Sequence, residues 1–100
     1  MLTLNEISTA VAAIAPQYEI DEVYLFGSYA RGDATEESDV DFRVVGGNIP
    51  TLFELGGLYE DFIEAFDRRV GRVDIVMTDS ISESFYDLIK DEEILIYAQV

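Results

Sequence analysis

A glycine–serine turn followed at a fixed distance by two aspartates is the part of this chain whose residues could do chemistry. Gly27 and Ser28 end an apolar segment, and Asp39 and Asp41 follow after ten intervening residues. Side chains two positions apart on an extended strand point to the same face, so the two carboxylates should converge. The turn could hold an anion opposite them. A hard divalent cation that joins phosphate oxygens to the carboxylate pair is the simplest chemistry for this layout, and the hypothesis is transfer of a nucleotidyl group.

A third carboxylate would help to hold the metal nearest the nucleophile, and Asp74 is the candidate. It lies in the apolar segment 73–77, where alternation should place it on the face opposite Val73 and Ile75. Three carboxylates a few Å apart repel one another by about 4 kcal/mol per pair at an effective dielectric near 20. Metal ions cancel that repulsion, whereas a metal-free fold must raise the carboxylate pKa values. The three aspartates therefore predict a metal site, provided that their strands are neighbours.

Composition narrows the classes of function. The 100 residues include 21 Asp and Glu against 6 Lys and Arg, a formal charge of −15. So acidic a surface repels phosphate backbones, which argues against direct nucleic-acid binding and favours a basic protein partner, although acidic surfaces also serve solubility. The chain has no Cys and no His, so any metal must take oxygen ligands. There is no membrane-length apolar run and no signal-peptide pattern, so we expect a cytoplasmic protein that does not enter a membrane.

Helix and strand patterns alternate along the chain and should position these residues. The expected helices run from Thr3 to near Pro16, over 50–66 and over 80–91, and the expected strands cover 23–26, 40–45, 70–77 and 94–97, with a helical turn and loop at 30–38. The order predicts a single α+β domain over 1–100, with a small mixed β-sheet flanked by helices. Gly56 and Gly57 inside a helix cost roughly 1 kcal/mol each relative to Ala. Either a close packing contact offsets this cost or the helix bends there.

Charged residues outside the aspartate group have simpler interpretations. Arg68, Arg69 and Arg72 are expected at the end of the 50–66 helix, where cations complement the helix dipole. The acidic cluster 91–93 is expected to be solvated surface, unless it meets a basic partner. Arg31 is either a surface ion-pair residue or a ligand contact.

The segment 26–42 resembles the GS-x10-DxD signature of the DNA polymerase β-like nucleotidyltransferase superfamily, and no position departs from it. The Ala-Arg-Gly step at 30–32 and the short length resemble the minimal nucleotidyltransferases (MNT), which are antitoxins paired with HEPN-domain toxins. The order of the flanking elements, Asp74 and the segment 94–97 extend the likeness over most of the chain. The resemblance implies a nucleotidyltransferase domain over 1–100 with the polymerase β-like fold.

The resemblance also implies roles for individual residues. The turn at 27–28 would bind a terminal phosphate through the serine hydroxyl and backbone N–H groups, and its glycine would allow a close approach. Asp39 and Asp41 would coordinate two Mg2+ ions. Asp74 would bind one of these metals and prepare the attacking hydroxyl. Arg31 would make an auxiliary phosphate contact or orient the loop.

The implied reaction is transfer of AMP from ATP to a tyrosine hydroxyl of a partner HEPN toxin, which silences the RNase activity of that toxin. Two alternatives stay open. The chain could neutralise its partner by occlusion alone, an idea that the charge of −15 supports. It could instead use a small-molecule acceptor, although 100 residues leave little room for an added substrate domain.

Overall fold

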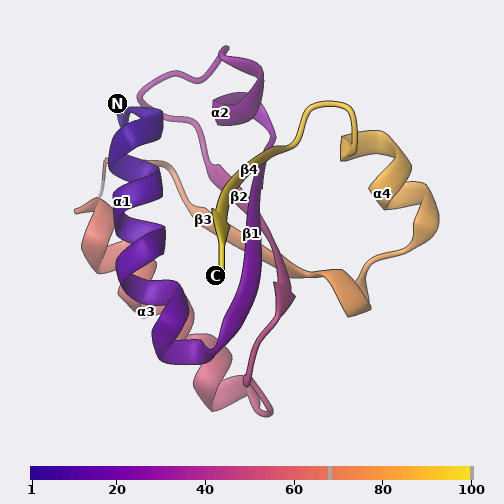
Figure 1. Cartoon of the computed structure of the whole chain (residues 1–100). Helices are drawn as coiled ribbons and strands as arrows, with labels where there is room; N and C mark the ends of the chain where they lie inside the picture. The colour runs from indigo at the N-terminus through magenta and orange to yellow at the C-terminus, as the bar shows by residue number, and fades with distance from the viewer. Residues whose placement is uncertain (68, 100) are drawn as a thin grey trace.

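The computed structural model describes residues 1–67 and 69–99. Its elements, drawn in Figure 1, are α1 (Leu4–Ile14), the 3₁₀ helix η1 (Ala15–Tyr18), β1 (Ile20–Phe26), α2 (Ser28–Arg31), β2 (Val40–Gly46), α3 (Leu52–Phe66), β3 (Val73–Met77), the 3₁₀ helix η2 (Thr78–Ser80), α4 (Glu83–Ile89) and β4 (Ile94–Ala98). The α+β class and the order of the elements are confirmed. The first strand begins earlier than expected, at Ile20, and the third begins later, at Val73.

Another expectation concerns the arginines near the end of α3. Arg68 lies outside the described residues, and Arg69 and Arg72 follow α3 rather than belonging to its last turn. Arg69 donates to both carboxylate oxygens of Glu6 on α1, so it joins the N-terminal helix to the segment after α3. In the part of the chain that the structure describes, no helix has the length and apolar character needed to cross a lipid bilayer.

The sheet is mixed and has four strands in the order β3-β2-β1-β4. β1 lies at the centre and pairs antiparallel with both β2 and β4. β2 pairs in parallel with β3. The parallel pair is possible because the long connection through α3 returns the chain to the end of the sheet where β2 began.

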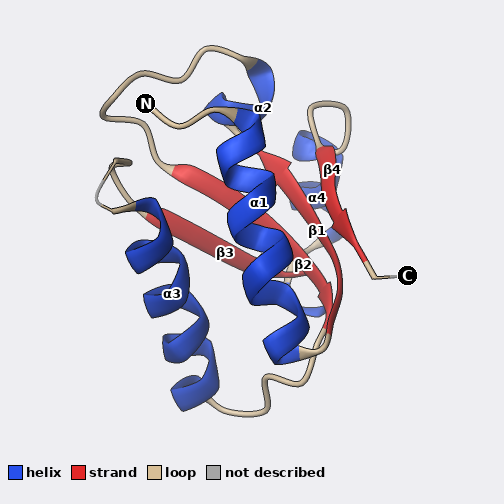
Figure 2. Ribbon diagram, turned by 60° about the vertical axis from the view of Figure 1, so that its left-hand side comes forward, coloured by secondary structure: helices blue, strands red, loops and turns tan. Residues whose placement is uncertain are grey.

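Helices α1 and α3 cover one face of this sheet, as Figure 2 shows. Both helices begin at a threonine that caps the first turn, Thr3 for α1 and Thr51 for α3. The ring of Phe42 stacks on that of Phe62 with centroids 5.0 Å apart, and on that of Phe66 at 6.1 Å. All three rings are buried, so this aromatic stack holds α3 on β2.

The other face of the sheet is partly covered by α4, which packs over β2. Arg43 of β2 is only 6% exposed, although alternation predicted an open position for it. Its guanidinium lies over the ring of Tyr24 at 4.3 Å and over that of Tyr86, from α4, at 5.0 Å. Phe26 and Phe85 meet edge to face at 6.0 Å. β2 is therefore enclosed on both sides along part of its length.

The two glycines within α3 have different surroundings. A Cβ on Gly57 would lie 3.1 Å from the hydroxyl oxygen of Tyr18, whereas a Cβ on Gly56 would meet nothing within 4 Å. That Tyr18 hydroxyl also donates a hydrogen bond of 2.7 Å to Asp61. α3 continues through both glycines without interruption. A close contact thus explains Gly57, and Gly56 stands at an open position.

Candidate functional site

The glycine–serine turn connects the end of β1 to the single-turn helix α2. Gly27 has φ +76°, a conformation that favours glycine, and its carbonyl accepts from the N–H groups of Ala30 and Arg31, both at 3.0 Å. Phe26, the residue before it, is the register partner of Asp41 on β2. A Cβ on Gly27 would overlap the carboxylate of Asp41. The turn therefore packs directly against one of the predicted site residues, and only glycine leaves room for it.

Asp41 and Asp74 are register partners across the parallel strands β2 and β3. Both aspartates are half-buried. The next residue on each strand, Phe42 and Ile75, points into the core, so by alternation the two carboxylates lie on the face opposite the α1–α3 layer. The pKa of Asp41 is raised to about 6, first by burial and then by the negative charges of Asp74 and Asp39. The structure therefore places two of the three aspartates side by side, in an environment that opposes full ionisation.

Asp39 lies just before β2, beside this pair. Its carboxylate forms an ion pair of 3.3 Å with Arg72, and a Cβ on Gly71 would overlap it. Backbone hydrogen bonds from Gly71 to Ser38 (2.8 Å) and from Val40 to Arg72 (2.9 Å) hold the two segments together. Within residues 1–67 and 69–99, no three acidic side chains are gathered closely enough to hold a metal ion as they stand. Asp39 influences Asp41 through its charge rather than through direct contact.

The chemistry of this group of aspartates fits a hard divalent cation. All its donors are carboxylate oxygens, the ligands that Mg2+ and Ca2+ prefer, and the described chain carries no competing His or Cys. The pKa of Asp41 is raised first by burial and then by repulsion from Asp74 and Asp39, and a cation between these carboxylates would relieve that repulsion. The assignment of each aspartate as a metal ligand stays a prediction.

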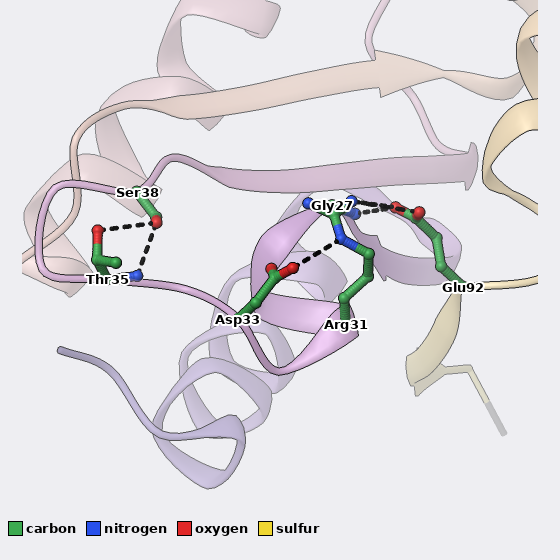
Figure 3. A network of polar contacts seen from close by, with 6 residues as sticks. All are labelled: Gly27, Arg31, Asp33, Thr35, Ser38 and Glu92. Carbon is green, nitrogen blue, oxygen red and sulfur yellow. Dashed lines mark hydrogen bonds and ion pairs between the residues drawn. The ribbon is translucent and has the colours of Figure 1, made fainter.

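Ser28 and Arg31 lie on α2, beside the turn. Ser28 is half-buried, and among the described residues its hydroxyl makes no hydrogen bond, whereas its carbonyl accepts from Gly32 at 3.0 Å. Arg31 forms ion pairs of 3.3 Å with Asp33 and with Glu92, which raise its pKa. Figure 3 shows the guanidinium between these two carboxylates. Arg31 is thus an ion-pair residue in this structure, next to a serine whose hydroxyl is available.

The acidic cluster 91–93 is not simply solvated, and this expectation was wrong for two of its members. Glu92 accepts a hydrogen bond of 2.5 Å from the N–H of Gly27. Glu93 accepts from Arg43 at 2.6 and 2.9 Å, and the side chains of this pair are 5% and 7% exposed. The signal that could have found Glu93 is Arg43, since an arginine between apolar strand residues requires a carboxylate partner.

Comparison with protein families matches residues 9–99 to the family described as polymerase beta, nucleotidyltransferase. The chain is 41% identical over 86 residues to the protein adenylyltransferase MntA of Thermococcus cleftensis, covering 81% of this chain and 83% of that protein. It is 32% identical over 102 residues to a Methanocaldococcus jannaschii protein named as a candidate protein adenylyltransferase, covering 95% and 98%.

Solved structures support the same fold. A candidate minimal nucleotidyltransferase superposes with a TM-score of 0.75 at 27% identity, over 93% of this chain and 95% of that one. A chain from a complex of a tri-AMPylated Shewanella oneidensis HEPN toxin with an MNT antitoxin gives a TM-score of 0.64 at 21% identity, over 96% and 70%, a likeness of fold alone. With the family match over nearly its whole length, the chain belongs to the polymerase β nucleotidyltransferase family and is an enzyme of the nucleotidyltransferase class.

Proposed function

We propose that this protein is an antitoxin that transfers AMP from ATP to a tyrosine hydroxyl of a HEPN-domain toxin and so silences the RNase activity of that toxin. The observation that carries the proposal is the Asp41–Asp74 register pair, with the pKa of Asp41 raised, set against the glycine–serine turn. A protein that only binds its partner does not need two carboxylates in mutual repulsion. The 41% identity to a protein adenylyltransferase supports a protein acceptor.

In this proposal the turn binds the terminal phosphate of ATP, and the aspartates hold the metal ions. Ser28 donates its available hydroxyl to a terminal phosphate, and Gly27 allows that phosphate to approach the backbone. Arg31 offers a guanidinium on the same side. Asp39 and Asp41 would hold two Mg2+ ions, with Asp74 sharing one. When bound, such ions neutralise phosphate charge and favour attack at phosphorus.

The chain's own carboxylates also handle the acceptor. In this proposal Asp74 accepts the proton of the tyrosine hydroxyl as the tyrosine oxygen attacks the α-phosphorus of ATP. The new bond joins the tyrosine oxygen to the α-phosphorus, the bond to the bridging oxygen of the β-phosphate breaks, and pyrophosphate leaves. The net charge of −15 would draw a basic partner toward the enzyme over longer distances.

The test is direct. The protein is incubated with Mg2+, labelled ATP and the product of the neighbouring open reading frame, and the intact mass of that product is measured. We expect an increase by one or more AMP units, and a loss of at least a hundredfold in rate for Asp41→Ala or Asp39→Ala. Glu36→Gln, an exposed acid in the loop before Asp39, serves as the control and should transfer normally. Retained activity in the Asp41 variant would refute the role given to that carboxylate.

The charge of −15 also favours the second candidate, neutralisation by occlusion. The same Asp41→Ala variant separates the two functions. If it still protects cells from the toxin while failing to transfer AMP, binding is sufficient and catalysis is dispensable.

A further inference from the structure

A carboxylate of the chain itself lies on the glycine–serine turn. Glu92 belongs to the connection between α4 and β4, 65 residues from Gly27 along the chain. Its Oε2 accepts the 2.5 Å hydrogen bond from the N–H of Gly27, and Nη1 of Arg31 lies 3.3 Å from Oε1 and 3.4 Å from Oε2. Figure 3 shows both donors pointing at the same carboxylate. One backbone N–H and one guanidinium thus converge on a single anionic group.

These two donors are the groups that a phosphate of a bound nucleotide would use. A carboxylate and a phosphate present the same kind of charged oxygen to N–H donors. In a chain with 6 basic and 21 acidic residues, few sites can offer an anion a guanidinium. We propose that Glu92 is an internal competitor, occupying the anion site of Gly27 and Arg31 until a nucleotide phosphate displaces it. This inference rests on the proposed function, because it assumes that the phosphate binds at this turn.

The loop that carries Glu92 does not depend on this contact for its position. The neighbouring Glu93 holds it through the buried two-point pair with Arg43, and the backbone N–H groups of both glutamates donate to Ile89 at 3.0 and 3.2 Å. The side chain of Glu92 is 21% exposed and that of Arg31 is 48% exposed. The Glu92 carboxylate can therefore leave while the loop stays fixed.

Arg31 also keeps a partner when Glu92 leaves. Asp33, two residues away, forms its own ion pair of 3.3 Å with the Nε atom of Arg31, on the other side of the guanidinium. Displacement of Glu92 thus frees the Gly27 N–H and one edge of the Arg31 guanidinium, while Asp33 keeps the guanidinium in position. The consequence is a lower apparent affinity for nucleotide, by the fraction of molecules in which Glu92 is away from the turn.

The experiment compares Glu92→Gln and Glu92→Ala with Asp91→Asn in the whole chain. Asp91 is the exposed neighbour, so its substitution removes the same charge from the same loop. Binding of the ATP analogue AMP-PNP with Mg2+ is measured by titration calorimetry. We expect both Glu92 variants to bind about tenfold more tightly than the wild type, and Asp91→Asn to bind within twofold of it. Equal or weaker binding by the Glu92 variants would overturn the proposal and leave the proposed function standing.

A second measurement separates the two hypotheses. The Gly27 amide is followed by proton–nitrogen NMR while inorganic tripolyphosphate is added without metal. We expect a shift of this amide in the Glu92→Gln protein at concentrations about tenfold lower than in the wild type. If tripolyphosphate moves the Gly27 amide in this way and the Glu92 variants bind AMP-PNP more tightly, but no AMP is transferred to the partner, the proposed function fails and the competition stands. If the amide does not respond in the Glu92→Gln protein, the competition is refuted.

Discussion

The ionised carboxylate of Asp41 is destabilised in the folded state. Its pKa of about 6 lies above the usual value of 3.8, because of burial and the charges of Asp74 and Asp39. A group whose pKa is raised by folding contributes stability below its unfolded pKa and loses that contribution as the pH rises through its folded pKa. Metal-free protein should therefore lose stability between about pH 4 and pH 6 on account of this residue.

Asp41→Asn removes that loss. We expect the variant to be more stable than the wild type by about 1 to 2 kcal/mol at pH 7.5 with a chelator present, since a shift of two pKa units bounds the effect and solvent screening reduces it. The gain should disappear below pH 4. Urea unfolding across this pH range measures it, with Asp91→Asn as the control for net charge. A destabilised Asp41→Asn protein at pH 7.5 would contradict the electrostatic account.

Gly27 and Gly32 lie at the two ends of α2. Both have a positive φ, but Gly27 combines φ +76° with ψ −157°, a region that essentially only glycine adopts, whereas Gly32 has φ +87° and ψ 11°, in the left-handed helical region, so alanine is more strained at Gly27. Only at Gly27 would the added Cβ overlap Asp41, while at Gly32 it would meet nothing within 4 Å. Thermal unfolding should show a loss of about 1 to 2 kcal/mol for Gly32→Ala and a larger loss for Gly27→Ala, and the AMP-transfer assay should show a loss of transfer for Gly27→Ala alone. Equal behaviour would show that the turn does not shape the carboxylate.

Residues whose role follows from turn spacing or strand alternation could be predicted from the sequence. Contacts with distant segments could not. The turn, Asp41 and Asp74 follow from local spacing and alternation, and the structure places them together. Glu92 lies in an acidic run that looks solvated, because its partner is a backbone N–H, which leaves no trace in composition. Asp39 satisfied the spacing, yet its ion pair with Arg72 depends on a segment 33 positions away.

The strands β1 and β3 begin at other residues than predicted, because their first backbone groups bond to segments distant in the sequence. The apolar pattern predicted a strand from residue 70, but Gly71 and Arg72 use their backbone groups to hold Ser38 and Val40 before the strand begins. β1 starts earlier than its apolar run because β2 pairs with it as far as Ile20. Local pattern predicted the four strands and the helices α1, α3 and α4, but not the two 3₁₀ helices, and tertiary hydrogen bonding determined where the strands end.

At the scale of elements, the helix α3 offers a prediction through its paired glycines. Gly56→Ala should stabilise the protein by about 0.5 to 1 kcal/mol, because alanine lowers the entropy of the unfolded chain and its methyl group enters open space. Gly57→Ala should gain less or lose stability, because its Cβ would press on the Tyr18 hydroxyl that is bonded to Asp61. Chemical denaturation of the two variants measures this. If Gly57→Ala stabilises as much as Gly56→Ala, the contact with Tyr18 has no energetic consequence.

The whole molecule is strongly self-repelling. A charge of −15 on 100 residues destabilises the compact state, and salt screens repulsion between surface charges over about 10 Å at 0.1 M. The melting temperature at pH 7.5 should therefore rise by several degrees between 0.02 and 0.5 M NaCl. Near pH 4.1, where the net charge vanishes, the effect should be absent or reversed. A melting temperature that falls with salt at pH 7.5 would mean that specific ion pairs outweigh the net repulsion.

The order of the strands puts β3 on the rim of the sheet, with hydrogen bonds to one neighbour only. Asp74 lies on this edge strand, whereas the aromatic stack is buried between α3 and β2. Fraying of this edge strand would separate Asp74 from Asp41 while the pairing of β1 with β2 could persist. Catalytic competence is thereby linked to an edge of the sheet, and the enzyme can lose activity before the rest of the chain unfolds.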